Sequence, residues 1–135
     1  MDGLTGGITL GSMNPTESLL VAIVDDDEFF RRSVARIVGL AGFRVKIFGS
    51  AEDFLERGDM DRTACAILDM KLPGMSGLDL QQRLIAKPTP IPVVFVSAHD
   101  EAMMQASALR AGAVAFLKKP FDNSTLLDVL SRSIR

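Results

Sequence analysis

The chain has 135 residues, 47% of them hydrophobic, which suits one globular domain and leaves little room for two. Its 15 Lys and Arg residues and 17 Asp and Glu residues give a formal net charge of -2, so no charge excess favours nucleic acid or an anionic membrane as a partner. The single cysteine, Cys65, and the single histidine, His99, exclude an internal disulfide and a Cys/His metal cluster, and they fit a cytoplasmic location. No apolar run approaches the ~20 residues that a membrane-spanning helix needs.

Residues 1–18 are rich in Gly, Thr and Ser and show no periodicity, so they are predicted to form a flexible leader. Gly11-Ser12-Met13 resembles a cloning junction, which predicts that residues 1–12 are vector-derived. The chain does not start with a basic segment followed by an apolar one, so no signal peptide is expected. Residues 19–135 are predicted to form a single domain.

Five strand-like segments alternate with five segments of helical periodicity. The first strand is apolar throughout, which predicts burial on both faces of a parallel sheet, whereas the second alternates apolar and basic residues like an exposed edge strand. Short connections between such elements predict a parallel sheet with helices on both faces and right-handed crossovers. The predicted strands are 19–24, 43–47, 63–68, 93–96 and 113–117.

The helices are predicted from apolar stripes and from the residues at their ends. Ser50 and Ser76 suit N-cap positions. Gly42 and Gly112 suit the position after a helix, where a left-handed backbone costs glycine little. Ile85 is expected to face the core with the other apolar residues of its helix. The predicted helices are 28–40, 51–58, 77–86, 101–111 and 123–134.

Acidic residues follow two of the predicted strands. Asp25 and Asp26 come after the first strand, and Asp69 comes after the third. The carboxyl ends of parallel strands meet at one edge of the sheet, and ligands bind at this edge in open α/β folds. Carboxylates brought together repel one another, and a hard divalent cation such as Mg²⁺ relieves that repulsion. The alternative for this acidic run is helix capping, and Asp27 is expected to be either a helix cap or a solvated residue.

A hydroxyl and a lysine complete this edge. Ser97 follows the fourth strand, and Lys119 follows the last one. Since successive residues of an extended segment point to opposite sides, only one of Lys118 and Lys119 can face the acids, and we expect Lys119 to do so, with a cis bond to Pro120. The alternatives are a serine that caps the next helix and a solvated surface lysine. Cys65 is predicted to be a small buried core residue.

These segments, in this order and spacing, resemble the receiver domain of two-component response regulators over residues 19–135. The resemblance implies an α/β fold: a doubly wound five-stranded parallel sheet of strand order 2-1-3-4-5, the flavodoxin-like receiver fold. Residues 111–121 are most similar to receivers joined to helix-turn-helix output domains, which implies transcription regulation. The matching segments are 24–27, 68–77, 96–98, 111–113 and 119–121.

The resemblance also implies the roles of the acidic residues. Asp69 is expected to be the phosphoacceptor. Mg²⁺ is expected to be bound directly by Asp26, Asp69 and the backbone carbonyl of Lys71, and through water by Asp25. Lys71 and His99 occupy positions that tune dephosphorylation in this family.

The remaining roles concern the phosphoryl group and the switch. Ser97 and Lys119 are expected to contact the phosphoryl group, together with backbone N–H groups near Met70 and Ala98. Phe116 occupies the aromatic switch position of the family. Since it lacks a phenol oxygen, a switch there has to work by packing.

The expected function is signalling, with catalysis limited to the domain's own phosphorylation and dephosphorylation. A sensor histidine kinase or a phosphotransfer protein would donate the phosphoryl group from a phosphohistidine. The fourth helix, last strand and last helix would then change their surface to control an output domain or a partner protein. A homodimer formed on phosphorylation would use the same surface.

Three alternatives stay open from the sequence. A receiver-like interaction domain would work without phosphorylation. A phosphatase of another aspartyl-phosphate family would usually have an acid two residues after the nucleophile, where this chain has Lys71. A flavodoxin-like nucleotide binder would have a glycine-rich loop after the first strand. The chain ends at Arg135, so we expect either a stand-alone regulator or a truncated piece of a transcription factor.

Overall fold

The computed structural model describes residues 19–98 and 102–134. Its centre is a five-stranded sheet in which every pair of neighbouring strands is parallel, in the order β3-β2-β4-β5-β6. The first predicted strand is β2, so this arrangement confirms the expected order 2-1-3-4-5. The predicted leader, residues 1–18, and His99 lie outside the described residues. The strands are β2 (Leu20–Val24), β3 (Arg44–Phe48), β4 (Thr63–Asp69), β5 (Val93–Ser97) and β6 (Ala115–Lys118).

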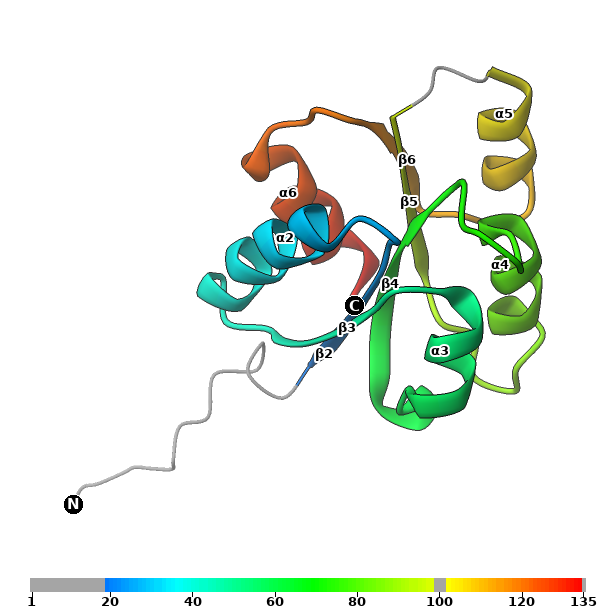
Figure 1. Ribbon diagram of the computed structural model, residues 1–135, viewed down its shortest axis with the longest axis horizontal. Coiled ribbons are helices and arrows are strands. Elements are labelled where there is room, and N and C mark those ends of the chain that lie inside the picture. Colours follow the sequence, from blue (N-terminus) through cyan, green and yellow to red (C-terminus); the bar gives the residue numbers. More distant parts are fainter. Residues whose placement is uncertain (1–18, 99–101, 135) are drawn as a thin grey trace.

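Helices cover both faces of the sheet. The α2 and α6 helices lie on one face, and α3, α4 and α5 lie on the other (Figure 1). None of the helices within the described ranges is long and apolar enough to cross a membrane. The helices are α2 (Glu28–Leu40), α3 (Ala51–Arg57), α4 (Gly77–Ile85), α5 (Ala102–Arg110) and α6 (Asn123–Ser133), with a short 3-10 helix, η2 (Met60–Arg62), before β4.

Two hydrophobic clusters form the core, one on each face of the sheet. Alternate residues of β2 separate between them: Val21 and Ile23 pack under α2 and α6, and Ala22 and Val24 pack under the other helices. All residues of β2 and β5 are buried because helices cover both faces. Cys65 is also buried, as predicted, and burial raises the pKa of its thiol to about 11.

The residues predicted to cap or follow the helices are confirmed. The Ser50 and Ser76 hydroxyl oxygens accept the backbone N–H groups three residues later at 3.0 and 3.1 Å. Gly42 and Gly112 adopt φ values of 102° and 105°, in the left-handed region that favours glycine. The Lys119–Pro120 peptide bond is cis, as expected.

The structure differs from the predictions at the bounds of several elements and at Ile85. The last strand starts at Ala115 rather than at residue 113, because the Ala113 N–H still donates to the Ala108 carbonyl and closes the end of α5. The edge strand runs from Arg44 to Phe48, one residue later than predicted. Ile85 is 36% exposed, so the prediction that it faces the core was wrong. It lies about 100° around the helix from the buried Leu84, beyond the covered face.

Candidate phosphoacceptor site

The predicted polar residues meet at the carboxyl end of the sheet because parallel neighbouring strands carry them. Asp25 directly follows β2, and Asp69 is the last residue of β4. The register pairs Val24 with Leu68, so the two aspartates leave adjacent strands at nearly the same level. On the other side of β4, β5 ends at Ser97.

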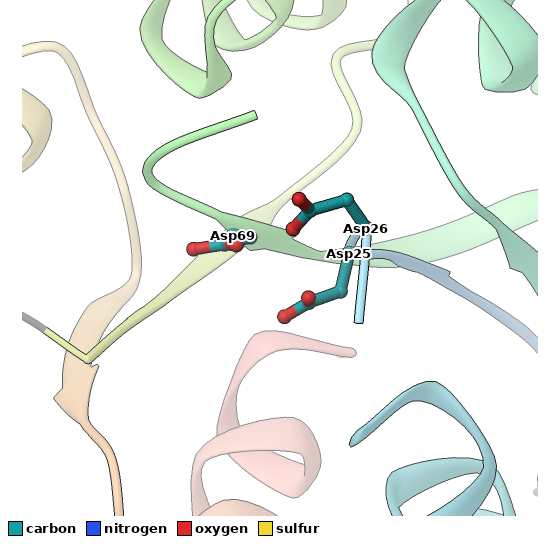
Figure 2. Close-up of side chains that lie close together, drawn as sticks. All are labelled: Asp25, Asp26 and Asp69. Carbon is teal, nitrogen blue, oxygen red and sulfur yellow. The ribbon is translucent and has the colours of Figure 1, made fainter. Parts of the chain in front are cut away.

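Asp25, Asp26 and Asp69 form an acidic trio. One carboxylate oxygen of each residue lies within 4.8 Å of the others (Figure 2). Asp25 and Asp69 are buried, whereas Asp26 is exposed. Figure 2 shows the Asp25 and Asp26 side chains leaving the backbone in different directions, each toward the side on which Asp69 lies. The trio is therefore open to solvent through Asp26, and two of its members are shielded.

The electrostatic cost of this arrangement falls on Asp69. Burial, followed by repulsion from Asp25, raises the pKa of Asp69 from 3.8 to about 6, and repulsion from Asp26 adds to the shift. Lys119 opposes the rise, as does the Lys71 backbone N–H, which donates to Asp69 Oδ1 at 3.3 Å. The net upward shift means that the protein itself compensates the negative charge only partly.

Lys119 is the cation that faces the trio. Its Nζ donates to Asp25 Oδ2 at 2.8 Å, with the side chains 19% and 1% exposed respectively. The other oxygen of Asp25, Oδ1, accepts the Asp27 backbone N–H at 2.9 Å. Lys118 is exposed, so the expectation that Lys119 would be the lysine facing the acids is confirmed.

Ser97 and Phe116 lie on the two strands beyond Asp69. Ser97 is 1% exposed, and its backbone carbonyl accepts the Lys119 N–H at 2.7 Å, which joins the ends of β5 and β6. Phe116 is half-buried and packs into the cluster under α3, α4 and α5, where its ring centroid lies 6.5 Å from that of Phe95. Phe116 is therefore a packing residue of the interior beside the site.

Three backbone N–H groups near the trio are already paired. Asp27 Oδ1 accepts the N–H groups of Phe29 and Phe30 at 3.0 and 3.3 Å, which confirms that Asp27 caps α2. The Met70 N–H donates to the Val96 carbonyl at 2.9 Å as part of the sheet. Of the backbone N–H groups near Met70, the one that faces Asp69 is therefore the next along the chain, that of Lys71.

Sequence reasoning missed three residues that support the site. The Arg31 guanidinium donates to the Asp25 backbone carbonyl oxygen at 2.7 Å. Glu52 Oε2 accepts the Met75 N–H at 2.8 Å and so ties α3 to the loop after Asp69, and this bond lowers the pKa of Glu52. The Phe30 ring lies against Lys119 Nζ. The Glu52 and Phe30 contacts join segments distant in the chain, and no local pattern announces them.

The fold and the acidic edge agree with what similarity to known proteins shows. The family model described as the response regulator receiver domain matches residues 21–131. This chain therefore belongs to the response regulator receiver domain family of two-component systems, and it is a signalling domain.

Curated relatives and solved structures lead to the same family. The chain is 38% identical over 120 residues to nodulation protein W of Bradyrhizobium diazoefficiens, covering 89% of this chain and 53% of the relative. It is also 38% identical over 123 residues to response regulator protein TmoT of Ectopseudomonas mendocina, covering 91% and 56%. The solved structure of the response regulator StyR is similar with a TM-score of 0.79 and 40% identity, covering 87% of this chain and 59% of that one. The chain thus spans about half the length of the curated relatives it matches.

Proposed function

We propose that this chain is a phosphoacceptor signalling domain in which Asp69 receives a phosphoryl group. The donor is a phosphohistidine on a sensor histidine kinase or a phosphotransfer protein, which places the chain in the cytoplasm. The observation that carries the proposal is the acidic trio facing Lys119 at the edge of a receiver sheet. An idle charge at the end of a buried strand would be costly, and two such charges occur here.

The residues present fit a magnesium site. Three carboxylates offer hard oxygen ligands at one point, and the raised pKa of Asp69 reports negative charge that a cation would neutralise. Asp26 and Asp69, with the backbone carbonyl of Lys71, would hold the ion directly. Asp25 would act through water, because its two oxygens already accept hydrogen bonds from Asp27 and Lys119. When bound, Mg²⁺ supplies positive charge beside the phosphoryl oxygens on which negative charge accumulates.

The chemistry at Asp69 is a displacement at phosphorus. A carboxylate oxygen of Asp69 bonds to phosphorus while the phosphorus–nitrogen bond of the phosphohistidine breaks, and its electron pair goes to the imidazole nitrogen, which takes up a proton. Lys119 and the Ser97 hydroxyl contact the phosphoryl oxygens, and the Lys71 N–H is a further donor at this place. In the separate dephosphorylation reaction, a water oxygen bonds to phosphorus while the bond between phosphorus and the Asp69 oxygen breaks. The electron pair returns to the Asp69 carboxylate, and inorganic phosphate and a proton are released. Catalysis is limited to these two reactions of the domain itself.

Phosphorylation then shifts the population between two surface states. Moving a two-state equilibrium from 1:99 to 99:1 takes about 5.5 kcal/mol, whereas one hydrogen bond to a charged group contributes about 1.5–3 kcal/mol. Ser97 alone is therefore insufficient, and Lys119 and backbone donors share the task. Movement of Ser97 toward the phosphoryl group vacates space that the half-buried Phe116 ring can fill.

The proposed readout surface consists of α5, β6 and α6. Met103, Leu109 and Val114 are apolar residues on and beside α5 with 86%, 43% and 40% exposure, so this side offers apolar contact area. The partner is an output domain, a separate protein or a second phosphorylated copy of this chain. The relatives that carry transcriptional names support an output that regulates transcription.

The test is incubation with Mg²⁺ and acetyl phosphate, followed by intact-mass measurement. Wild-type protein should gain the mass of one phosphoryl group, and Asp69→Asn should not. Asp27→Asn is the matched control and should gain the mass normally, because Asn caps a helix as well as Asp does. A gain that persists in Asp69→Asn would remove Asp69 from the role. The absence of any gain in wild-type protein would favour an interaction domain that works without phosphorylation.

A further inference from the structure

The Lys119 ammonium has a second partner besides Asp25. Its Nζ lies 3.8 Å from the centroid of the Phe30 ring, in addition to the 2.8 Å bond to Asp25 Oδ2. Phe30 belongs to the first turn of α2, and Lys119 follows β6, so the contact joins segments far apart in the chain. The ammonium is thus in contact with an anion and with an aromatic face.

The contact is attractive for a physical reason. The face of an aromatic ring carries negative electrostatic potential, and a cation within about 6 Å of the centroid is drawn to it. The attraction is stronger where water is displaced, and the Lys119 side chain is only 19% exposed. Unlike the ion pair with Asp25, this attraction does not require Lys119 to stay at one oxygen atom.

The Phe30 ring is itself held in place. At its backbone, the Phe30 N–H donates to the Asp27 cap at 3.3 Å. At its ring, Phe121 packs in an edge-on arrangement with centroids 6.1 Å apart and planes at 85°. A cavity of about 420 Å³ opens beside this pair, lined by residues of α2 and of the segment after Lys119. Without the ring, the long lysine side chain would have this space and the nearby solvent available to it.

We propose that Phe30 is a positioning residue for Lys119, and this proposal rests on the proposed function of Lys119 as a phosphoryl contact. Lys119 has to move from Asp25 toward a phosphoryl group on Asp69. The aromatic face keeps the ammonium at the edge of the sheet during that change of anionic partner, because the ring attracts the cation in both positions. Contact with Phe30 already restricts the Lys119 side chain. Lys119 therefore loses less conformational entropy when it binds the phosphoryl group.

The test replaces Phe30 with mono-, di- and trifluorinated phenylalanine and with leucine. Fluorination withdraws electron density from the ring face while it keeps nearly the same shape, so a packing role and a cation–π role give different results. The rate of Asp69 phosphorylation by acetyl phosphate at saturating Mg²⁺ should fall stepwise along the series. The fall should reach about fivefold to about thirtyfold for the trifluorinated ring and for Phe30→Leu, with recovery in Phe30→Trp.

Phe29 supplies the matched control, because it lies on the same turn and its side chain is 80% exposed. The same substitutions at Phe29 should leave the rate unchanged. A second readout is the proton NMR shift of the Lys119 ε-methylene group in metal-free protein. Ring currents should move it upfield in wild type, and Phe30→Leu should abolish the displacement.

Each adverse result identifies what fails. A normal wild-type rate that stays constant along the Phe30 series would overturn the positioning role and leave the proposed function intact. An undisplaced Lys119 resonance in wild type would overturn the contact itself. The absence of phosphorylation in wild type would overturn both proposals, and Asp69→Asn would then behave like wild type.

Discussion

Buried polar residues at the two ends of the parallel sheet differ in whether a partner satisfies them. At the amino end of β4, Thr63 is buried, and its hydroxyl donates to the Asp59 carbonyl at 2.6 Å, so a neutral group is satisfied by a local neutral partner. At the carboxyl end of the same strand, Asp69 is buried beside Asp25, and its pKa rises to about 6. The β4 strand therefore begins with a hydrogen-bonded hydroxyl and ends with a carboxylate that the charge of Asp25 repels.

This difference separates requirements of folding from requirements of function. Burying a hydroxyl with its hydrogen bond made is close to neutral for stability, whereas burying like charges together destabilises the folded state. If stability were the only requirement, buried polar groups at both ends would be neutral and hydrogen-bonded, as Thr63 is. Under the proposed function, the charges at the carboxyl end would serve phosphoryl transfer and metal binding.

Removal of Lys119 should produce the largest change. Lys119→Met leaves Asp25, with a side chain 1% exposed, without its cation, and the free energy of unfolding should fall by about 3 kcal/mol at neutral pH. The pKa of Asp69 should rise above its wild-type value, because Lys119 opposes that rise. Chemical denaturation measures the first effect, and NMR titration of the carboxyl carbon measures the second.

The exposed neighbour provides the control for that change. Lys118→Met should alter the unfolding free energy far less, since the Lys118 residue lies outside the acidic trio. Combining Asp25→Asn with Lys119→Met should restore most of the loss, because position 25 then carries no unpaired buried charge. If both lysine substitutions lowered the unfolding free energy equally, the ion pair between Lys119 and Asp25 would not be what stabilises this end of the sheet.

Asp69→Asn should raise the free energy of unfolding of metal-free protein, and the increase should depend on pH. Because the pKa of Asp69 in the folded state lies above its ordinary value of 3.8, the folded state holds the proton more tightly, and wild-type stability falls as pH rises from about 4 to about 6. A shift of this size corresponds to about 3 kcal/mol, and screening by solvent at the open edge reduces it to about 2 kcal/mol. Asn does not titrate, so the variant should be more stable than wild type by this amount at pH 7.

Denaturant unfolding in EDTA at pH 4 and pH 7 checks this prediction. The stabilisation should be present at pH 7 and should be mostly lost at pH 4, where Asp69 is protonated in the folded state and only partly ionised in the unfolded state. A gain of equal size at both pH values would attribute the effect to packing. Added Mg²⁺ should stabilise wild type and so narrow the gap at pH 7.

Thr63→Val should have the smallest effect of the three. The substitution conserves shape but removes the hydroxyl that donates to Asp59, and the free energy of unfolding should fall by about 1 kcal/mol. Because the groups involved are neutral, this loss should be the same at pH 4 and pH 7. A loss that depends on pH would mean that a titrating charge also affects stability at the amino end of the sheet.

The sequence predicted the fold well because its signals are local. Whole-apolar strands, Ser50 and Ser76 as caps, and glycines after helices report conformations that each segment favours on its own. The errors lie where a tertiary neighbour decides the outcome. Ile85 is apolar yet exposed, because burial depends on what lies opposite the helix face.

The acidic trio followed from the sequence by one inference, that parallel strands bring their carboxyl ends together. The residues that support the trio did not follow. Glu52 ties the loop after Asp69 from 23 residues away in the chain, and Phe30 meets Lys119 across the gap between α2 and the segment after β6. Neither contact could be predicted from the sequence, because its two residues are far apart in the chain and form no recognisable pattern.

The amino-acid order by itself determined which segments become strands and helices, and which carboxylates, hydroxyl and ammonium stand at the strand tips, because backbone preference and hydrophobic periodicity act over a few residues. Only the tertiary structure decided that Lys119 pairs with Asp25 and rests on Phe30, and that Asp69 becomes hard to ionise. Those properties depend on distance and on exclusion of water, and both exist only after the chain has packed.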